Sequence, residues 1–346
     1  MRTLSERALN RALLARQLLL APADLPLARA VERVGGLQSQ YAPSAYVGSW
    51  SRLRAFERAD LTRALERGGL VQATLMRATI HIVSRRDFWP IAVALRRPRR
   101  SWWLRATRQA VDPGTMATAA RRVRAMLREG PRRRSEIVAA LGADAATWNG
   151  LGLWLDLVRV PPSGTWEHRR ADLYALAERV IGPPPAGTTE ASGRDLLVRR
   201  YLAAFGPASP SDVSSFTGLP RSLLVPVIER LPVRRFRDER GDELLDMPRG
   251  PIPDARTPAP VRFLPTWDAT LLVHARRTQI LPEPVRPVIF NTKTPHSMAT
   301  FLVDGQVAGT WRLDDGQVRV SAFGDMTATA WRGVRDEAER LEAFLA

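Results

Sequence analysis

The feature that most constrains the fold is a pattern of helix-ending residues that occurs twice in the middle of the chain. Gly130-Pro131 and, 76 residues further on, Gly206-Pro207 each follow a stretch of helical periodicity, and helices commonly end at such residues. After each pair the sequence predicts a short helix that ends at a glycine, a third helix, and two strands joined by a turn. Three helices and a hairpin are the order of a winged helix-turn-helix unit, and the repetition favours tandem units.

The two copies have the same predicted order of elements. In the first copy the helices are expected over 115–128, 135–141 and 144–155, and the strands over 157–160 and 172–175. In the second copy the helices are expected over 192–204, 211–217 and 220–231, and the strands over 233–237 and 243–247. Ser211 is the expected cap of the short helix in the second copy.

The N-terminal stretch is predicted to form a third, divergent copy. Thr3 and Glu6 have the spacing of a capping box, which predicts a helix that continues to about Leu20. Further helices are expected over 25–34 and 59–67, and strands over 70–74 and 79–84. An insertion at 35–56 separates the second and third helices. It is the least regular part of this half of the chain, and such insertions in regular scaffolds often carry function.

From about Val261 the chain changes to short segments in which apolar and polar residues alternate. Strands are expected over 261–264, 270–274, 287–290, 299–303, 306–311 and 317–322, followed by a helix over 336–345. The predicted fold class is therefore α+β, with three tandem winged helix-turn-helix units and a C-terminal β-rich domain that forms a partial barrel. The expected divisions are 1–110, 111–185, 190–250 and 258–346.

The charge of the chain points to a polyanionic partner. Its net charge is +17, and 51 of its 52 cationic residues are arginine. GC-rich codon usage explains the preference for arginine over lysine, but it does not explain the excess of positive charge. We interpret that excess as a binding surface for nucleic acid first and for an anionic membrane surface second.

Several classes of site have no support in the sequence. The absence of cysteine excludes disulfides, thiolate zinc sites and cysteine nucleophiles. The four histidines lack metal-ligand spacing, and there is no glycine-rich phosphate loop or serine elbow. We therefore expect no metal and no cofactor. No apolar run reaches the roughly 18 residues of a spanning helix, and the N-terminus does not resemble a signal peptide. The expected location is the cytoplasm, in association with the nucleoid.

The insertion contains two glutamines, Gln38 and Gln40, shortly after Gly35-Gly36. At this spacing both side chains face the same side of an extended segment. The two glycines permit a close approach to another stretch of backbone. From these residues alone, two surface glutamines after a helix end remain a valid alternative to a functional pair.

Five segments carry a resemblance to a known family. They are Gly36-Leu37-Gln38-Ser39-Gln40, the stretch from Leu75 to Ser84, the stretch from Val158 to Trp166, Leu264-Pro265-Thr266-Trp267-Asp268, and the stretch from Leu302 to Trp311. With them, nearly the whole chain resembles the winged-helix DNA glycosylases typified by the azinomycin-resistance glycosylase of Streptomyces. That family has three tandem winged-helix units, a C-terminal β domain and a catalytic Gln-x-Gln motif, which falls here on Gln38 and Gln40. A related branch has aspartate at the second position.

The resemblance implies a monofunctional DNA glycosylase that hydrolyses the N-glycosidic bond of N7-alkylated purines. The substrates would include bulky natural-product adducts and interstrand crosslinks, in DNA repair or antibiotic self-resistance. Alkylation at N7 makes the base cationic and a good leaving group. A glutamine amide can hydrogen-bond a water and a developing charge, but it cannot act as a strong base. The alternative function is that of a non-enzymatic winged-helix DNA-binding protein, such as a transcription regulator.

The expected partner is double-stranded DNA containing alkylated guanine, bound by a monomer, since no dimerisation helix is evident. The residues expected to contact DNA are Tyr41, Trp50, Arg77, His81, Arg132, Arg133, Arg134, Arg169, Arg170, Lys293 and His296. Tyr41 and Trp50 flank the glutamines, whereas the arginines are expected at turns and in a wing. Trp102 and Trp103 have the chemistry to stack on bases, although core packing explains them better.

Overall fold

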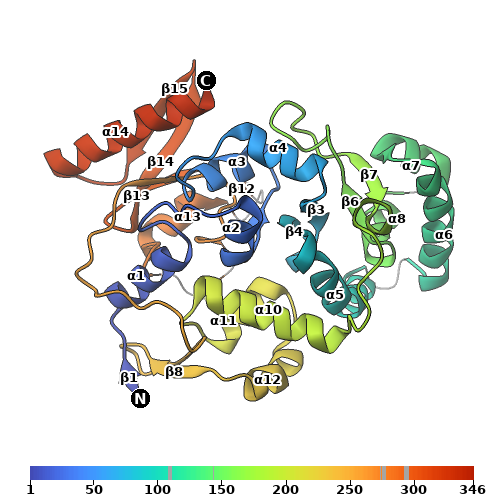
Figure 1. Ribbon diagram of the computed structural model, residues 1–346, viewed down its shortest axis with the longest axis horizontal. Helices are drawn as coiled ribbons and strands as arrows, with labels where there is room; N and C mark the ends of the chain where they lie inside the picture. The colour runs from blue at the N-terminus through green and yellow to red at the C-terminus, as the bar shows by residue number, and fades with distance from the viewer. Residues whose placement is uncertain (108–110, 143, 273, 275–277, 292–295) are drawn as a thin grey trace.

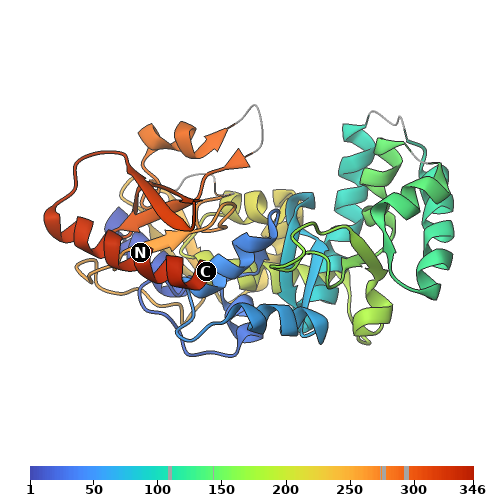
Figure 2. The ribbon, with the colours of Figure 1, turned by 90° about the horizontal axis from the view of Figure 1, so that it is seen from above.

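The computed structural model describes the chain except for residues 108–110, 143, 273, 275–277 and 292–295. The fold is mixed α+β and elongated, with a three-helix bundle (α6 to α8) at one end and the C-terminal helix α14 with its sheet at the other (Figure 1). Figure 2 shows the same separation of the two ends from above. No helix within the described residues combines the length and the apolar character that crossing a bilayer requires.

The N-terminal region follows the predicted order, but the first helix ends at Arg16 and not near Leu20, and the helix over 85–106 was not predicted. It contains β1 (Arg2–Thr3), α1 (Glu6–Arg16), α2 (Leu27–Arg33), β2 (Leu37–Gln38), α3 (Ala42–Trp50), α4 (Arg58–Glu66), β3 (Leu70–Thr74), the short 3-10 helix η1 (Met76–Ala78), β4 (Ile80–Ser84) and α5 (Arg85–Ala106). The expected cap at Thr3 is wrong: Ser5 caps α1 by accepting from the Ala8 amide, and Thr3 lies in β1. The insertion is more regular than expected, because it folds into β2 and α3.

The two internal copies form the elements that the sequence predicts. The first contains α6 (Pro113–Glu129), β5 (Arg132–Arg133), α7 (Arg134–Leu141), α8 (Ala145–Trp154), β6 (Leu157–Arg159) and β7 (Leu173–Leu176), followed by α9 (Ala177–Ile181). The second contains α10 (Glu190–Phe205), α11 (Pro210–Thr217), α12 (Arg221–Arg230), β8 (Arg234–Arg237) and β9 (Glu243–Asp246). The expected cap at Ser211 is wrong by two residues, because Ser209 accepts from the Asp212 amide and caps α11.

The C-terminal region is partly helical where strands were expected. It contains β10 (Arg262–Leu264), η2 (Glu283–Val285), α13 (Arg286–Ile289), β11 (Phe290–Asn291), β12 (His296–Ser297), β13 (Thr300–Val303), β14 (Gln306–Asp314), β15 (Gln317–Ala322) and α14 (Ala328–Leu345). The described part of 270–274 forms turns, so the strand predicted there is wrong. The sheet has the linear order β10-β13-β14-β15, with α14 packed against it.

One six-stranded antiparallel sheet joins the N-terminal region to the first internal copy. Its order is β2-β4-β3-β6-β7-β5. The junction is the pairing of β3 with β6, in which Gln72 lies opposite Arg159 and Ala73 opposite Val158. Continuous hydrogen bonding across this junction removes two exposed strand edges. It also fixes the hairpin β6–β7 relative to β2, the strand that carries Gln38.

The main hydrophobic core is shared by segments that are distant in the sequence. It includes Leu13 of α1, Val71 of β3, Leu95 of α5, Leu202 of α10 and Leu264 of β10. Helix α10 packs along α5, whose two prolines, Pro90 and Pro98, obscure its helical pattern in the sequence. By contrast, α6, α7 and α8 enclose a core of their own. The centre of the molecule is therefore a jointly packed body to which the three-helix bundle is joined through the sheet.

A buried ion pair attaches α3 to the C-terminal region. The Arg52 guanidinium, directly after α3, donates to both carboxylate oxygens of Asp268 at 2.9 Å and to Thr270. Both partners are buried. Burial alone would raise the pKa of Asp268, but Arg52 and Thr270 hold the pKa below its usual value. Because α3 follows the two glutamines, this pair also fixes the position of the candidate site.

Replacing Arg52 with methionine should leave the Asp268 carboxylate buried without its cation. Loss of one partner of such a pair costs about 3–5 kcal/mol, and we expect a fall of that size in the free energy of unfolding by urea denaturation. The matched control is Arg54→Met two residues later, where the side chain is exposed. Equal stability of the two variants would contradict the role given to the pair.

Candidate active site

Gln38 lies in a short strand at the edge of the central sheet. In the pairing of β2 with β4, Leu37 is opposite Ile82 and Gln38 is opposite His81. Gln38 is only 7% exposed, whereas Gln40, just beyond the strand, is exposed. The sheet therefore buries Gln38 and leaves Gln40 exposed at its edge.

The glycine before the motif allows β2 to lie close to β4. Gly36 has a φ of +91°, and a Cβ there would lie 3.2 Å from a methyl group of Val83 and 3.3 Å from the Ile82 carbonyl oxygen. Any other residue would be strained both by this backbone conformation and by these neighbours. The close approach expected from the glycine pair is thus observed at Gly36.

The residue between the two glutamines is fixed by two contacts. The Ser39 amide donates to the Ile80 carbonyl oxygen at 2.8 Å. The Gln72 side-chain amide donates to the Ser39 hydroxyl at 3.0 Å. Sequence reasoning missed Gln72, although a glutamine within the apolar strand 70–74 was the available signal. A buried polar side chain in a strand generally needs a specific partner.

The orientation of both glutamine amides follows from their partners. The Arg77 Nη2 atom donates to Gln38 Oε1 at 2.7 Å. The Ile80 backbone amide donates to Gln40 Oε1 at 2.7 Å. A guanidinium and a backbone N–H can only donate, so the atom facing each of them must be the amide oxygen. The side-chain nitrogens therefore point away from these donors.

Neither glutamine nitrogen has a hydrogen-bond partner within the described parts of the chain. No carboxylate in those parts hydrogen-bonds to either glutamine. Each oxygen still has a second lone pair. The pair can consequently donate through nitrogen and accept through oxygen, but it includes no group with the pKa of a general base.

Arg77 is held between β2 and α11 by contacts with Gln38 and Phe216. Its φ is +52°, and that of Ala78 is +60°. Its guanidinium donates to the Phe216 carbonyl oxygen and lies 5.2 Å from the centre of the Phe216 ring. Burial lowers the pKa of Arg77 to about 10, so it remains cationic at neutral pH. Arg77 was expected to contact DNA, but its guanidinium instead binds Gln38 and Phe216 of α11 within the protein.

His81 is buried and neutral beside Gln38. Its Nδ1 lies 3.0 Å from the Thr79 carbonyl oxygen, an acceptor, so Nδ1 carries the proton. Burial and the charge of Arg77 lower the pKa of His81 to about 3. Its Nε2 has no hydrogen-bond partner among the described residues. His81 therefore brings no positive charge to a DNA phosphate at neutral pH.

The wing between β6 and β7 reaches the exposed end of the motif. Arg169 donates to the Tyr41 hydroxyl at 3.0 Å and lies over the Tyr41 and Trp166 rings. The Trp166 amide donates to the Tyr46 hydroxyl of α3 at 3.1 Å. Tyr41 is 44% exposed. Two residues predicted from separate segments, Tyr41 and Arg169, are thus brought together next to Gln40.

Other predicted contact residues lie elsewhere. The Trp50 ring is stacked on Phe344 of α14, 5.8 Å between ring centres, and is 9% exposed, so it packs in the core and does not line an exposed surface. Trp102 is half exposed at the end of α5, and Trp103 is partly buried near Gly150. His296 is in β12, and Lys293 lies outside the described residues.

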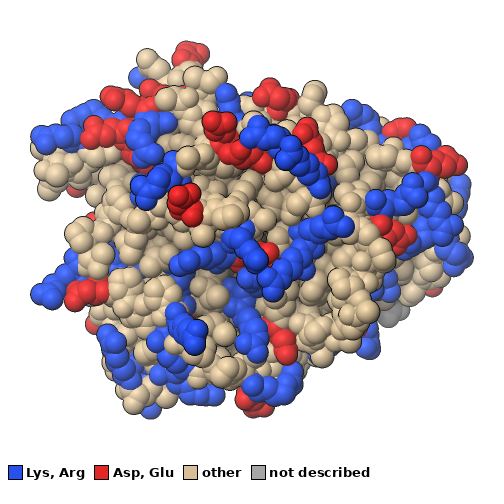
Figure 3. All heavy atoms as spheres, viewed as in Figure 1, with Lys and Arg blue, Asp and Glu red and all other residues tan. Residues whose placement is uncertain are grey.

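The predicted arginine cluster at the start of α7 is on the outer bundle. Arg133 and Arg170 both bind the Asp172 carboxylate, and the Arg134 guanidinium lies over the Trp148 ring. Arg132 pairs with Glu129 at 3.1 Å. Figure 1 places α7 at the edge of the molecule, away from β4 near its centre. Figure 3 shows further cationic side chains across the middle of this face, between α2 and α10, with carboxylates among them.

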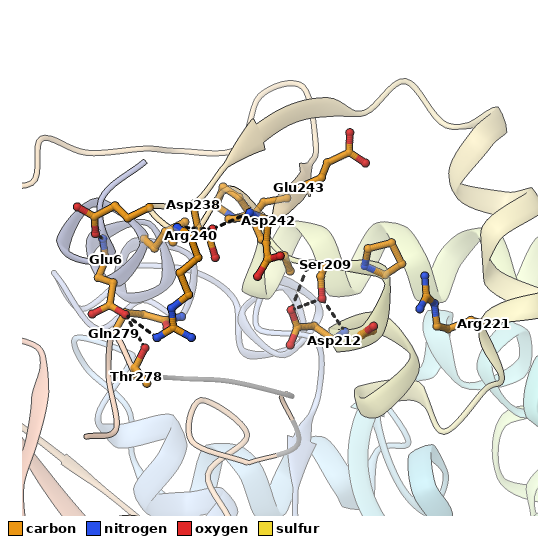
Figure 4. Close-up of a pocket in the computed structure, with 17 residues that line it drawn as sticks. Glu6, Ser209, Asp212, Arg221, Asp238, Arg240, Asp242, Glu243, Thr278 and Gln279 are labelled. Atoms are coloured by element: carbon orange, nitrogen blue, oxygen red, sulfur yellow. Dashed lines mark hydrogen bonds and ion pairs between the residues drawn. The ribbon is translucent and has the colours of Figure 1, made fainter. Parts of the chain in front are cut away.

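A separate hollow of about 590 Å³ lies between α1, α11 and the hairpin β8–β9 (Figure 4). Its acidic lining consists of Glu6, Asp212, Asp238, Glu239, Asp242 and Glu243. Among the described residues of its lining, the cationic side chains are Arg221 and Arg240, so acidic groups outnumber them. Nowhere in the described residues do three or more histidine or acidic side chains form a group able to hold a metal ion.

Comparison with known proteins identifies the family. The family model described as DNA glycosylase AlkZ-like matches residues 31–344. The chain belongs to this family. A search of solved structures finds the DNA glycosylase AlkZ of Streptomyces sahachiroi, with a TM-score of 0.82, 18% sequence identity, and coverage of 99% of this chain and 97% of that one. No curated protein matches the sequence.

Membership of the AlkZ-like DNA glycosylases gives the chain its general function, that of a DNA-binding enzyme of DNA repair. The likeness to the solved structure shows a shared fold. The family model begins shortly before the two glutamines. It includes Arg77 and Ile80, which contact the glutamines, and Gln72, which contacts Ser39 between them.

The buried neutral state of His81 predicts a loss of stability at acid pH. The unfolded state takes up a proton below its ordinary pKa of about 6.5, while the folded state does not until about pH 3, so stability falls as the pH falls between these values. Between pH 7.5 and 5.0 the wild type should lose about 2 kcal/mol more than His81→Gln in urea unfolding. His168→Gln, at an exposed position, should lose as much as the wild type. Identical losses for all three proteins would contradict the prediction.

Proposed function

We propose that this chain is a monofunctional DNA glycosylase that hydrolyses the N-glycosidic bond of N7-alkylated purines, including bulky adducts and interstrand crosslinks. The observation that carries the proposal is the fixed pair of glutamines, with no carboxylate hydrogen-bonded to either in the described chain. We further propose that Gln38 and Gln40 are the catalytic residues, as the family motif implies.

The chemistry requires little proton transfer from the protein. In an N7-alkylpurine the C1′–N9 bond breaks, and its electron pair neutralises the cationic base. A water oxygen then bonds to C1′, and a proton leaves to solvent, which produces an abasic site. The protein needs to hold the water and the sugar in place, a positioning role that hydrogen-bonding amides can fill.

The lack of a general acid in the two glutamine side chains predicts selectivity for labile lesions. A neutral purine is a poor leaving group and would need a general acid, which a glutamine cannot supply. The exposed position of Gln40 and Tyr41 supports access to lesions that are too large for a closed pocket. Bulky adducts and crosslinks are therefore included in the proposed substrate class.

The DNA-binding surface is proposed to be formed by three winged helix-turn-helix units on a monomer, within 1–110, 111–185 and 190–250, with the C-terminal domain at 258–346. The recurring order of three helices and a hairpin supports this division. Arg169 and Arg170 of one wing and Arg132, Arg133 and Arg134 near the start of α7 are its proposed phosphate contacts. Arg169 is the best supported, because it adjoins Tyr41 next to Gln40.

Gln38→Ala and Gln40→Ala should each abolish most excision and retain DNA binding. The assay is release of N7-methylguanine from duplex DNA under single-turnover conditions, followed as abasic sites, with binding to undamaged duplex measured separately. Loss of a positioned hydrogen-bonding group should lower the rate about 100-fold. The control is Gln317→Ala, an exposed glutamine of β15. A wild type that releases no base from N7-methylguanine, bulky adducts or crosslinked DNA would refute the proposed function.

Arg169→Ala and Arg170→Ala should weaken binding to all duplex sequences. Each phosphate contact that is lost should reduce the slope of log affinity against log salt by about 0.9. Titrations of duplex DNA at several salt concentrations measure this slope. Arg256→Ala, in the proline-rich stretch before the C-terminal sheet and almost fully exposed, should leave the slope unchanged. Slopes equal to that of the wild type would place the DNA on another surface.

A further inference from the structure

The hydrogen bond between Arg77 and Gln38 suggests that the two glutamines have different roles. Gln38 Oε1 accepts from a cation, whereas Gln40 Oε1 accepts from a neutral backbone amide. We propose that Arg77 is a positioning residue that commits Gln38 to act as a hydrogen-bond donor through Nε2, and leaves Gln40 to accept from the attacking water. This inference rests on the proposed glycosylase function.

The geometry makes Arg77 a rigid support. Its backbone lies in the left-handed region and passes close to Gly218, where an added Cβ would be 3.2 Å from the Arg77 nitrogen. Its guanidinium is bound by the Phe216 carbonyl oxygen and lies against the Phe216 ring. A side chain restrained at both ends has little freedom to release Gln38. The amide orientation of Gln38 is thus set before DNA binds.

The charge of Arg77 determines which end of the Gln38 amide is useful. No carboxylate in the described chain forms an ion pair with Arg77, so its positive charge acts directly on the Gln38 oxygen. A cation at the amide oxygen polarises the group and makes its N–H bonds stronger donors. The same charge repels a water proton that approaches this oxygen. Gln38 is therefore suited to donate to an electron-rich atom of the DNA or to the water oxygen.

The Gln40 oxygen accepts from a neutral backbone amide and not from a cation. It keeps one lone pair beside the Ile80 amide, and the side chain is exposed at the edge of the sheet. An acceptor in that position can orient one proton of a water without removing it. Together the two residues provide a donor and an acceptor at adjacent points, which is what holding a single water beside C1′ requires.

The isosteric substitution Gln38→Glu distinguishes donation from acceptance. It keeps the oxygen that accepts from Arg77, turns that hydrogen bond into an ion pair, and replaces the donating nitrogen with a second oxygen. We expect the single-turnover rate on N7-methylguanine DNA to fall as far as in Gln38→Ala, about 100-fold, with no fall in the thermal midpoint. A rate equal to or above that of the wild type would overturn the proposal, because Gln38 would then act as an acceptor.

A double-mutant cycle tests whether Arg77 acts through Gln38. Arg77→Ala should lower the rate about 10- to 100-fold, the range expected for loss of a charge-assisted hydrogen bond. The Arg77→Ala, Gln38→Ala double variant should be no slower than Gln38→Ala alone, and additive losses would overturn the proposal. The control is Arg100→Ala. Arg100 also lies over an aromatic ring, that of Trp154, and donates to the Leu153 carbonyl oxygen, but it does not contact the glutamines.

A spectroscopic measurement separates this inference from the proposed function. The side-chain amide signal of Gln38, assigned by its loss in Gln38→Ala, should be shifted from that of a free glutamine in the wild type. The shift should collapse in Arg77→Ala and persist in Arg100→Ala. An unshifted wild-type signal refutes the positioning role even if excision is normal. A shifted signal in a wild type without excision refutes the proposed function and not the contact.

Discussion

The pairing of β2 with β4 is the contact on which the candidate site depends. It places Gln38 opposite His81 and leaves Gln40 just beyond the last paired residue. The close approach at Gly36 permits this pairing, and the Ser39 amide extends it by binding the Ile80 carbonyl oxygen. Because β4 is also hydrogen-bonded to β3, and β3 to β6, the two glutamines are fixed relative to the wing that carries Arg169.

This arrangement suits an enzyme whose substrate is already activated. The residues next to Gln38 are a neutral histidine and an arginine whose charge reaches the Gln38 oxygen, and neither is a proton acceptor of useful strength at neutral pH. Rate acceleration in such a site comes from oriented amide dipoles and from a water molecule positioned by hydrogen bonds, not from proton transfer. The buried contacts of Ser39, Gln72 and Arg52 serve that purpose, since they limit movement of the segment that carries the glutamines.

Several sequence expectations failed for a common physical reason. Trp50 was expected near DNA because it follows the glutamines, but one face of α3 packs against α14 and buries its ring. His81 was expected to contact DNA because it lies on a hairpin, but β4 is an interior strand of the sheet. Proximity along the chain does not determine which face of an element is covered, and the ring that covers Trp50 belongs to Phe344, more than 200 residues away.

The sequence by itself determined the order of helices and strands in the two copies, the excess positive charge, and the Gln-x-Gln motif with its glycines. These follow from local signals: hydrophobic periodicity, helix caps and turn residues. Only the tertiary structure decided that β3 pairs with β6, that Arg77 binds Gln38, and that Tyr41 meets Arg169. These contacts join residues 39 or more positions apart, and such partners are selected by packing of the whole chain, which no local pattern specifies.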